Sequence, residues 1–437
     1  MSIVTPKTFK TYSLGCRVNQ AEMEAISRQL VTKGYALCQT KDQPDIVLLN
    51  TCAVTQKAEF ETRKEIRKLK RLYPQSFLVV LGCTVTAQEK YNIVLPQADL
   101  LVSNEAKQRV IDLLEEKFGS KPADLKQISQ SKYILSGRKF IKVQEGCDNF
   151  CTFCLTACLR GKPTSVPLPQ IIEEINYWES QGIKEIILTG INISLYGKDS
   201  PKQESVTSLI EKILCKTRIE RISLSSIYPQ MLTPDFLDLT INNPRISQYF
   251  HLSIQSGSQS VLQRMNRKTN LNKLGETLKQ IKAKNQSFTF RADFIAGFPD
   301  EAKEEFEETL QFIKENKISF VHAFPFSKRK GTAAFEMIEK KAWKDLPSQT
   351  KKERVKKVME TVKQIRQQEA ERLINQISNC LIVRGDEAIT HNGWPLRLRL
   401  HWKCSGQAIN KGQIVPVKIT AFENDQLGGE FIYPEES

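Results

Sequence analysis

Long apolar runs are missing from this sequence of 437 residues. The longest apolar stretches, residues 77–81 and 186–188, are far shorter than the roughly 20 apolar residues that a membrane-spanning helix needs. The N-terminal residues also lack the apolar core of a secretory signal. We therefore expect no membrane association and place the protein in the cytoplasm.

Histidine is also scarce, and the four histidines form no metal-binding pattern. His251, His322, His391 and His401 make up neither an HxxxH nor an HxxE grouping, so we interpret them as structural residues. The sequence has neither a GxxxxGK nor a GxGxxG motif, the two glycine-rich patterns that hold nucleotide phosphates. Use of a nucleoside triphosphate is therefore not supported.

Acidic residues are outnumbered by basic ones, 49 to 64, which gives a formal net charge of +15. Such a surplus attracts a polyanion, because neutralising its phosphates releases counterions. Nucleic acid is the first partner to consider, and the alternative is that the positive charge only aids solubility. With 40% hydrophobic and 26% charged residues, the composition is that of a globular protein of two or three domains.

The eleven cysteines are better explained by metal binding or catalysis than by disulfide bonds. Thiols stay reduced in the cytoplasm, so a disulfide framework is not expected there. Cys38, Cys215, Cys380 and Cys404 stand singly in ordinary segments, and we interpret them as small buried side chains. The other cysteines fall into two groups along the chain.

The first group lies in the N-terminal region, where apolar runs alternate with helical patterns. Residues 8–14, 45–50 and 77–81 are predicted to be strands of a parallel α/β domain, and each strand runs into a cysteine. These cysteines are Cys16, Cys52 and Cys83. Because the carboxyl ends of parallel strands line one edge of the sheet, the three thiols can converge on a shared metal site.

The second group is the CxxxCxxC run of Cys147, Cys151 and Cys154, which directly follows a predicted strand. A structural zinc site needs four protein ligands, commonly two CxxC pairs, and no second pair follows here. Three thiolates on a four-iron cluster leave one iron open for a small molecule. Cys158 follows Cys154 after three residues, as the last cysteine does in a ferredoxin pattern. If Cys158 were a fourth ligand, no iron of the cluster would be open for a small molecule.

The rest of the chain predicts a partial barrel followed by a small β-domain. Six predicted strands with helical patterns between them indicate a barrel shorter than the eight-unit form. They cover residues 140–144, 185–189, 221–225, 249–254, 288–295 and 320–324. Residues 348–377 are predicted to form a long charged helix. The short strands predicted after it cover residues 380–384, 397–401, 414–420 and 429–432.

The expected fold class is therefore α/β. An N-terminal parallel α/β domain is expected over residues 1–118, and a central partial (β/α)6 barrel over residues 133–347. A connecting helix follows over 348–375, and a small C-terminal β-barrel over 376–437. The polar stretch 116–136 is predicted to be the linker between the first two domains.

The cysteine loop from Glu145 to Cys154, with Phe153 before its last cysteine, resembles the radical S-adenosylmethionine (SAM) superfamily. In that superfamily the open iron of a 4Fe-4S cluster binds SAM, and an electron from the cluster cleaves SAM to a 5'-deoxyadenosyl radical. The resemblance implies that Cys147, Cys151 and Cys154 hold this cluster. It also implies that Cys158 is not a ligand, and Leu159 stands where a ferredoxin has proline.

The segments around the first three cysteines narrow the resemblance to the methylthiotransferases. Residues 12–22 (YSLGCRVNQAE), 49–55 (LNTCAVT) and 80–83 (VLGC) are similar to the N-terminal domain of these enzymes. In the family, three cysteines at these places hold a second 4Fe-4S cluster, whose open iron is thought to carry the inserted sulfur. The family often has Pro-x-x-Arg-Gly after the second cysteine group, and here Ala157 replaces the proline while Arg160 and Gly161 remain.

Further matches imply where SAM binds, as radical source and as methyl donor. They lie in residues 187–192, 224–227, 254–258 and 291–301. The residues that the resemblance assigns to SAM are Phe153, Thr189, Gly190, Asn192, Ser226, Gln255, Arg291 and Gly297. No catalytic residue can be named from the sequence.

The inner segments 188–193 and 224–229 are most similar to one branch of the family. That branch converts N6-threonylcarbamoyladenosine at position 37 of tRNA to its 2-methylthio derivative. Arg267 and Arg291 are the candidate cations for the carboxylate of the threonylcarbamoyl group. The alternatives are methylthiolation of N6-isopentenyladenosine in tRNA, methylthiolation of a ribosomal protein side chain, and a non-catalytic iron-sulfur protein that binds RNA.

The resemblance also implies partners. The C-terminal β-barrel is similar to the RNA-binding TRAM domain of these enzymes, so we expect the tRNA anticodon stem-loop as a partner. Its basic residues are Arg384, Arg397, Arg399, Lys403, Lys411 and Lys418. A reducing electron donor such as flavodoxin or ferredoxin is required, and the sequence does not identify the source of the sulfur.

Overall fold

The computed structural model describes residues 7–38, 43–119, 137–201, 204–399 and 410–432. The chain divides into two compact units. The N-terminal unit combines Met1–Ile134, Gly146–Lys162 and Ser327–Glu336, and the barrel unit combines Leu135–Glu145, Pro163–Phe326 and Met337–Ser437. The cysteine loop therefore packs with the N-terminal unit, although the sequence places it in the central domain. Most of the predicted linker, residues 120–136, lies outside the described residues.

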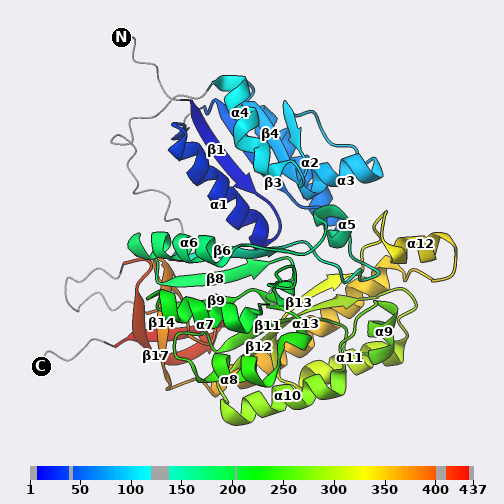
Figure 1. The fold of residues 1–437 in the computed structure, drawn as a ribbon. Coiled ribbons are helices and arrows are strands. Elements are labelled where there is room, and N and C mark those ends of the chain that lie inside the picture. The colour runs from blue at the N-terminus through cyan, green and yellow to red at the C-terminus, as the bar shows by residue number, and fades with distance from the viewer. Residues whose placement is uncertain (1–6, 39–42, 120–136, 202–203, 400–409, 433–437) are drawn as a thin grey trace, which may run out of the picture. The chain divides into compact units, whose positions relative to one another are not determined.

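A parallel five-stranded sheet forms the centre of the N-terminal unit, in the order β2-β1-β3-β4-β5 (Figure 1). Its strands are β1 (Thr8–Ser13), β2 (Ala36–Leu37), β3 (Ile46–Thr51), β4 (Phe77–Gly82) and β5 (Leu100–Val102). The helices of the unit include α1 (Arg17–Thr32), α2 (Gln56–Leu72), α3 (Cys83–Tyr91), α4 (Val110–Phe118) and α5 (Thr156–Arg160). The predicted parallel α/β domain is confirmed.

Apolar side chains cover both faces of this sheet. Leu48 of β3 belongs to the same buried cluster as Leu30 of α1, whereas the preceding Val47 packs with Ile66 of α2. Successive side chains of a strand point to opposite faces, so all six residues of β3 are buried. The helices on both faces fix the sheet edge from which the cysteines emerge.

Two four-stranded sheets form the partial barrel of the second unit, in the orders β7-β6-β8-β9 and β10-β11-β12-β13. All neighbouring strands run parallel except β7, which is antiparallel to β6. The strands are β6 (Arg138–Glu145), β7 (Thr164–Ser165), β8 (Glu185–Gly190), β9 (Arg221–Leu224), β10 (Ser226–Ile227), β11 (Tyr249–Gln255), β12 (Thr289–Ala296) and β13 (Ile318–Pro325). All six strands predicted from the sequence are present, and the two-residue strands β7 and β10 are additional.

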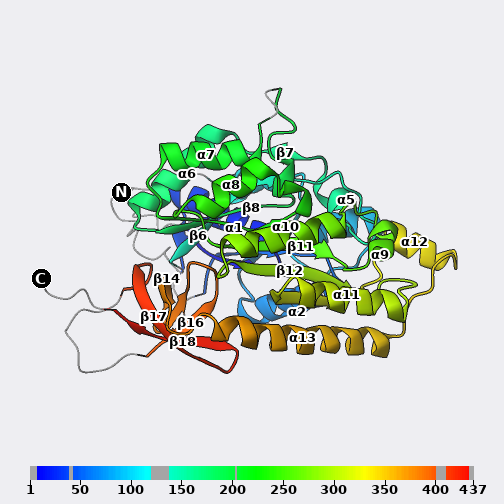
Figure 2. The ribbon, with the colours of Figure 1, turned by 90° about the horizontal axis from the view of Figure 1, so that it is seen from below.

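Helices alternate with these strands, as predicted. They are α6 (Leu168–Ser180), α7 (Val206–Lys216), α8 (Pro234–Asn242), α9 (Gln259–Arg264), α10 (Leu271–Lys284) and α11 (Lys303–Glu315). The short helix α12 (Ala333–Glu339) follows β13, and its residues up to Glu336 belong to the N-terminal unit. The long helix α13 (Ser348–Glu371) leads from there to the C-terminal barrel (Figure 2). It ends before the predicted residue 377, because Asn375 has a left-handed φ of 68° and the chain then enters a strand.

The C-terminal segment is a closed five-stranded barrel in the order β14-β15-β16-β18-β17. Its strands are β14 (Ile377–Arg384), β15 (Glu387–Ile389), β16 (Pro395–Leu398), β17 (Ile414–Glu423) and β18 (Gln426–Phe431). Trp394 joins the C-terminal barrel to the sheet β10-β11-β12-β13, called the central sheet below. Its ring packs on Phe320 of β13, and its Nε1 donates a 2.9 Å hydrogen bond to Thr289 of β12. His401, Lys403 and Cys404 lie outside the described residues. Within the described ranges, none of the helices is both long and apolar enough to cross a membrane.

Candidate iron-sulfur and substrate sites

The three cysteines of the first group stand at the carboxyl edge of the N-terminal sheet. Cys16 is the N-cap of α1 after β1, Cys52 follows β3, and Cys83 begins α3 after β4. These three strands are neighbours, so their ends lie side by side as the sequence predicted. Gly15, with a φ of +88°, lets the chain pass Cys52, because a Cβ at this position would lie 2.7 Å from the Cys52 Sγ.

The pKa values of Cys52 and Cys16 are both raised. Burial, and then the negative charges of Cys83 and Cys16, raise the pKa of Cys52 to about 12. Burial also raises the pKa of Cys16, against which the positive charge of Arg160 acts. Neighbouring thiolates repel one another, and a metal group stabilises them because it deprotonates its thiol ligands. The donor set therefore fits the second 4Fe-4S cluster.

Arg160, from the helix that follows the other cysteine group, completes the surroundings of Cys83. Its Nε donates a 3.2 Å hydrogen bond to the Cys83 Sγ. The other two nitrogens of the guanidinium contact Glu22 Oε1 at 3.0 Å and Asn19 Oδ1 at 2.5 Å. The Arg160 side chain is only 2% exposed, so these bonds form away from water.

Glu22 links Arg160 to a second buried cation. Its Oε2 lies 2.7 Å from the Nζ of Lys107 and accepts a 3.2 Å hydrogen bond from Asn50. Two cations and one carboxylate thus lie beside the first cysteine group. The surplus positive charge suits a site that holds several thiolates, because a buried charge must be balanced nearby.

The second cysteine group lies on a tight loop. Cys147 N donates to the carbonyl of Gly161 at 3.1 Å, and Cys154 N donates to the carbonyl of Cys151 at 2.9 Å. The pKa of Cys154 is raised to about 11, first by burial and then by Cys151 and Cys147. The charges of Cys151 and Cys147 thus act on the thiol of Cys154, and the three cysteines stay the predicted ligands of one cluster.

Cys158 interacts with residues outside this group. It lies in α5, where its carbonyl accepts a 2.9 Å hydrogen bond from Lys90 Nζ. Burial and then a side-chain hydrogen bond with Cys158 raise the pKa of Tyr91 to about 12. The contact with Tyr91 supports the prediction that Cys158 is not a cluster ligand.

Five of the residues predicted to bind SAM lie at or near the carboxyl ends of barrel strands. They are Thr189 and Gly190 in β8, Ser226 in β10, Gln255 in β11 and Gly297 directly after β12. Asn192, just after β8, donates from its backbone to Gln144 Oε1 at 2.8 Å. The buried Oγ of Ser225, between β9 and β10, has no hydrogen-bond partner among the described residues. A polar ligand at this edge would supply one, and the SAM assignments stay predictions.

The two arginines predicted as substrate cations make other contacts. Arg291 lies over the rings of Tyr249 and Phe320, at 5.1 and 4.3 Å, and bonds to the carbonyl of Gly393. Arg267 is buried, lies 4.2 Å from the ring centre of Tyr228 and bonds to a backbone carbonyl. These contacts give both arginines a packing role, and their roles toward SAM or substrate stay predictions. Phe153 belongs to the N-terminal unit.

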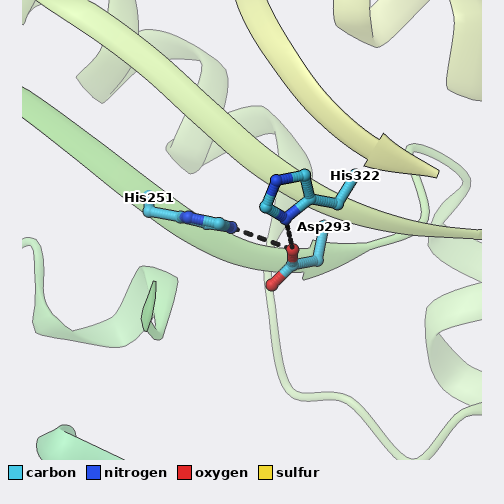
Figure 3. Close-up of side chains that lie close together, drawn as sticks. All are labelled: His251, Asp293 and His322. Carbon is cyan, nitrogen blue, oxygen red and sulfur yellow. Dashed lines mark hydrogen bonds and ion pairs between the residues drawn. The ribbon is translucent and has the colours of Figure 1, made fainter. Parts of the chain in front are cut away.

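One polar cluster was missed by the sequence analysis. His251, Asp293 and His322 meet on three neighbouring strands of the barrel, β11, β12 and β13 (Figure 3). His251 Nε2 lies 2.9 Å and His322 Nδ1 lies 3.3 Å from the same oxygen, Asp293 Oδ1. The interpretation of His322 as a structural residue rested on the absence of a local motif. Only the pairing of the strands could have revealed the cluster.

Comparison with known proteins identifies the class of fold. The model described as the Radical SAM superfamily matches residues 141–313, and the model described as Uncharacterized protein family UPF0004 matches residues 8–103. A solved structure of the radical SAM methyltransferase TsrM from Kitasatospora setae shares the fold, with a TM-score of 0.56 at 13% identity. The alignment covers 77% of this chain and 78% of that one.

Relatives along the full length define the family. The threonylcarbamoyladenosine tRNA methylthiotransferase MtaB of Chlamydia pneumoniae is 34% identical, over 97% of this chain and 98% of that protein. The tRNA-2-methylthio-N(6)-dimethylallyladenosine synthase of Clostridium tetani is 30% identical, over 97% of this chain and 96% of that protein. The chain therefore belongs to the methylthiotransferase family of radical SAM enzymes.

Proposed function

We propose that this enzyme converts N6-threonylcarbamoyladenosine at position 37 of tRNA to its 2-methylthio derivative. The observation that carries the proposal is that both cysteine groups lie in one compact unit, and that in each group the charges of neighbouring thiols raise the pKa of a buried thiol. Two such groups are what a methylthiotransferase needs, one for SAM and one for sulfur. The similarity to the Chlamydia pneumoniae protein, which is named for this substrate, supports the threonylcarbamoyladenosine branch of the family.

Each cysteine group would hold one 4Fe-4S cluster. Cys147, Cys151 and Cys154 would leave one iron open for SAM, and Cys16, Cys52 and Cys83 would hold the second cluster. When bound, the clusters and SAM supply the 5'-deoxyadenosyl radical, the sulfur and the methyl group. The chain itself holds the thiols on two loops, balances their charge with Arg160 and Lys107, and offers the strand ends of the barrel to SAM.

The substrate and the other partners follow from this reaction. The anticodon stem-loop carries the base, and Arg384, Lys411 and Lys418 on the closed C-terminal barrel are exposed to an RNA backbone. Flavodoxin or ferredoxin is the proposed electron donor, and tRNA as substrate places the enzyme in the cytoplasm. The division into an N-terminal domain, a barrel, a connecting helix and an RNA-binding domain is part of the same proposal.

The isopentenyl substrate is the main alternative, since the Clostridium tetani relative is named for it. The polar cluster of His251, Asp293 and His322 favours a polar group on the base, because such a site discriminates for a substituent that can form hydrogen bonds with it. A ribosomal protein side chain is the second alternative. A non-catalytic protein that only binds RNA does not require two complete cysteine groups.

The test is activity of the anaerobically reconstituted enzyme on matched substrates. Two anticodon stem-loop RNAs differ only in carrying threonylcarbamoyladenosine or isopentenyladenosine, and a ribosomal protein preparation is the third substrate. We expect a 2-methylthio product on the first RNA, detected by mass spectrometry of the nucleosides. A preference for the isopentenyl RNA or for the protein would contradict the proposed substrate.

A further inference from the structure

The cluster of His251, Asp293 and His322 lies on one face of the sheet formed by β10 to β13. Alternate residues of a strand share a face, and in the pairing of β12 with β13 Asp293 stands opposite His322. Ala292 and Phe294, the residues on either side of Asp293 in β12, are each 1% exposed and belong to the buried face. The three polar side chains therefore share the opposite, less buried face of the strands.

Exposure increases across the cluster from one histidine to the other. The side chain of His251 is 6% exposed, that of Asp293 18% and that of His322 62%. His251 and Asp293 thus form a buried support, and His322 is the part that a ligand can reach. Figure 3 shows both imidazoles directed at the same carboxylate oxygen.

The hydrogen bonds fix the state of the carboxylate and the orientation of the imidazoles. Burial alone would raise the pKa of Asp293, but the hydrogen bonds from His251 and His322 hold it far below its usual value. Asp293 is therefore an anion that accepts from both rings. With Nδ1 of His322 donating to Asp293, its Nε2 is the nitrogen that faces a ligand, and binding a carboxylate there requires this nitrogen to carry a proton as well.

An exposed aromatic ring stands beside this histidine. Phe324, two residues further along β13, is 42% exposed, and its ring centre lies 6.3 Å from that of His322. An unpaired RNA base stacks on such a ring. A histidine N–H next to a stacking platform suits a base that carries an anionic substituent.

We propose that His322, held in place by Asp293 and His251, binds the carboxylate of the threonylcarbamoyl group, with the adenine packed near Phe324. His322 is then a specificity-determining residue, and Asp293 and His251 are positioning residues. This inference rests on the proposed function and names the part of the site that recognises the substrate. It assigns to His322 the role that the sequence analysis gave to Arg267 and Arg291.

The test uses the anaerobically reconstituted holoenzyme and three anticodon stem-loop RNAs. One carries threonylcarbamoyladenosine, the second its threonyl methyl ester, and the third isopentenyladenosine. The ester keeps the size of the group and removes its charge. We expect the wild type to bind the acid about ten-fold more tightly than the ester, because a charge-assisted hydrogen bond is lost.

The variant His322→Gln should bind the acid and the ester with nearly equal affinity, so that the ratio of the two affinities is close to one. It should raise the KM for the acid about ten-fold and leave kcat largely unchanged, since the lost contact is made before and during the reaction alike. Asp293→Asn should lower the ratio in the same direction. Lys314→Gln, an exposed change on α11, is the matched control and should keep the wild-type ratio.

Three results would overturn the inference, and they can be told apart. A wild type that methylthiolates the acid but binds the ester equally well would leave the proposed function standing without this contact. If the ratio of acid to ester affinity were unchanged in His322→Gln, another residue would contact the carboxylate. A divalent metal ion beyond the cluster irons, lost in His251→Asn, would make the three side chains a metal site. Preference of the wild type for isopentenyl RNA would instead refute the proposed function.

Discussion

The Nε of Arg160 donates a 3.2 Å hydrogen bond to the Sγ of Cys83. Arg160 belongs to the loop that carries the second cysteine group, and Cys83 belongs to the first group. The first group is therefore contacted by the buried guanidinium of a residue that follows the second group. A substitution of Arg160 therefore changes the surroundings of Cys83, although Arg160 lies in the chain segment of the second cysteine group.

Replacing Arg160 by methionine should destabilise the N-terminal unit. Glu22 would lose one of two buried cations, and breaking a buried ion pair costs about 3–5 kcal/mol of unfolding free energy. Arg160→Lys should cost less, because it keeps the charge but not the three-way hydrogen bonding. Urea denaturation of the iron-free protein measures the difference. The exposed Lys64→Met serves as control, and an equal loss there would contradict the role of Arg160.

The two cysteine groups should bind iron independently. The reconstituted protein should hold about eight irons as two four-iron clusters. Alanine at Cys147, Cys151 and Cys154 should remove about half of the iron and all SAM cleavage. Alanine at Cys16, Cys52 and Cys83 should remove the other half and leave some SAM cleavage. Iron analysis and 5'-deoxyadenosine formation measure both effects, and loss of all iron from either folded variant would argue against two sites.

Cys158→Ser should keep its neighbouring cluster and the activity. A serine hydroxyl can still bond to Tyr91, the partner of Cys158 in the structure. The iron content and the SAM cleavage rate of the variant give the answer. If the cluster disappeared, Cys158 would be a ligand and the iron would have no open position for SAM.

Neutralising the exposed cations of the C-terminal barrel should weaken tRNA binding through charge alone. Deleting the whole barrel is a poorer test, because Trp394 ties it to the central sheet and the Arg221 contact with Asn379 ties it to β9. Glutamine at Arg384, Lys411 and Lys418 should reduce the slope of log affinity against log salt by about two to three. SAM cleavage without tRNA should be unaffected. An unchanged slope would mean that the barrel only covers the central sheet.

His391 should make the protein less stable in mild acid. Burial, and then the charge of Arg221, lower the pKa of His391 from 6.5 to about 4. The unfolded chain therefore takes up a proton first, so stability falls as the pH drops from 6.5 to about 4 and is constant above that window. The loss amounts to about 3 kcal/mol. Unfolding midpoints of the wild type and of His391→Gln across this range measure it, and parallel curves would contradict the assignment.

Local sequence patterns determined most of the secondary structure of this protein, and they single out the two groups of cysteines that are predicted to bind the clusters. Apolar runs that end at Cys16, Cys52 and Cys83 predict strands β1, β3 and β4, because strand and helix patterns depend on neighbouring residues. The second cysteine group lies within one short loop, so its spacing alone identifies it. The segments quoted around both groups were enough to place the chain in its family.

The tertiary structure decided which distant residues meet. His251, Asp293 and His322 come together only through the register of three parallel strands, and no local spacing encodes that register. Arg291 and Arg267 contact aromatic rings and backbone carbonyls in the fold, and no local pattern in the sequence predicts these contacts. Arg160 likewise contacts Cys83 only because the segment Gly146–Lys162 packs with the N-terminal unit. Such contacts join residues far apart in the chain, so packing and strand pairing determine them rather than local propensity.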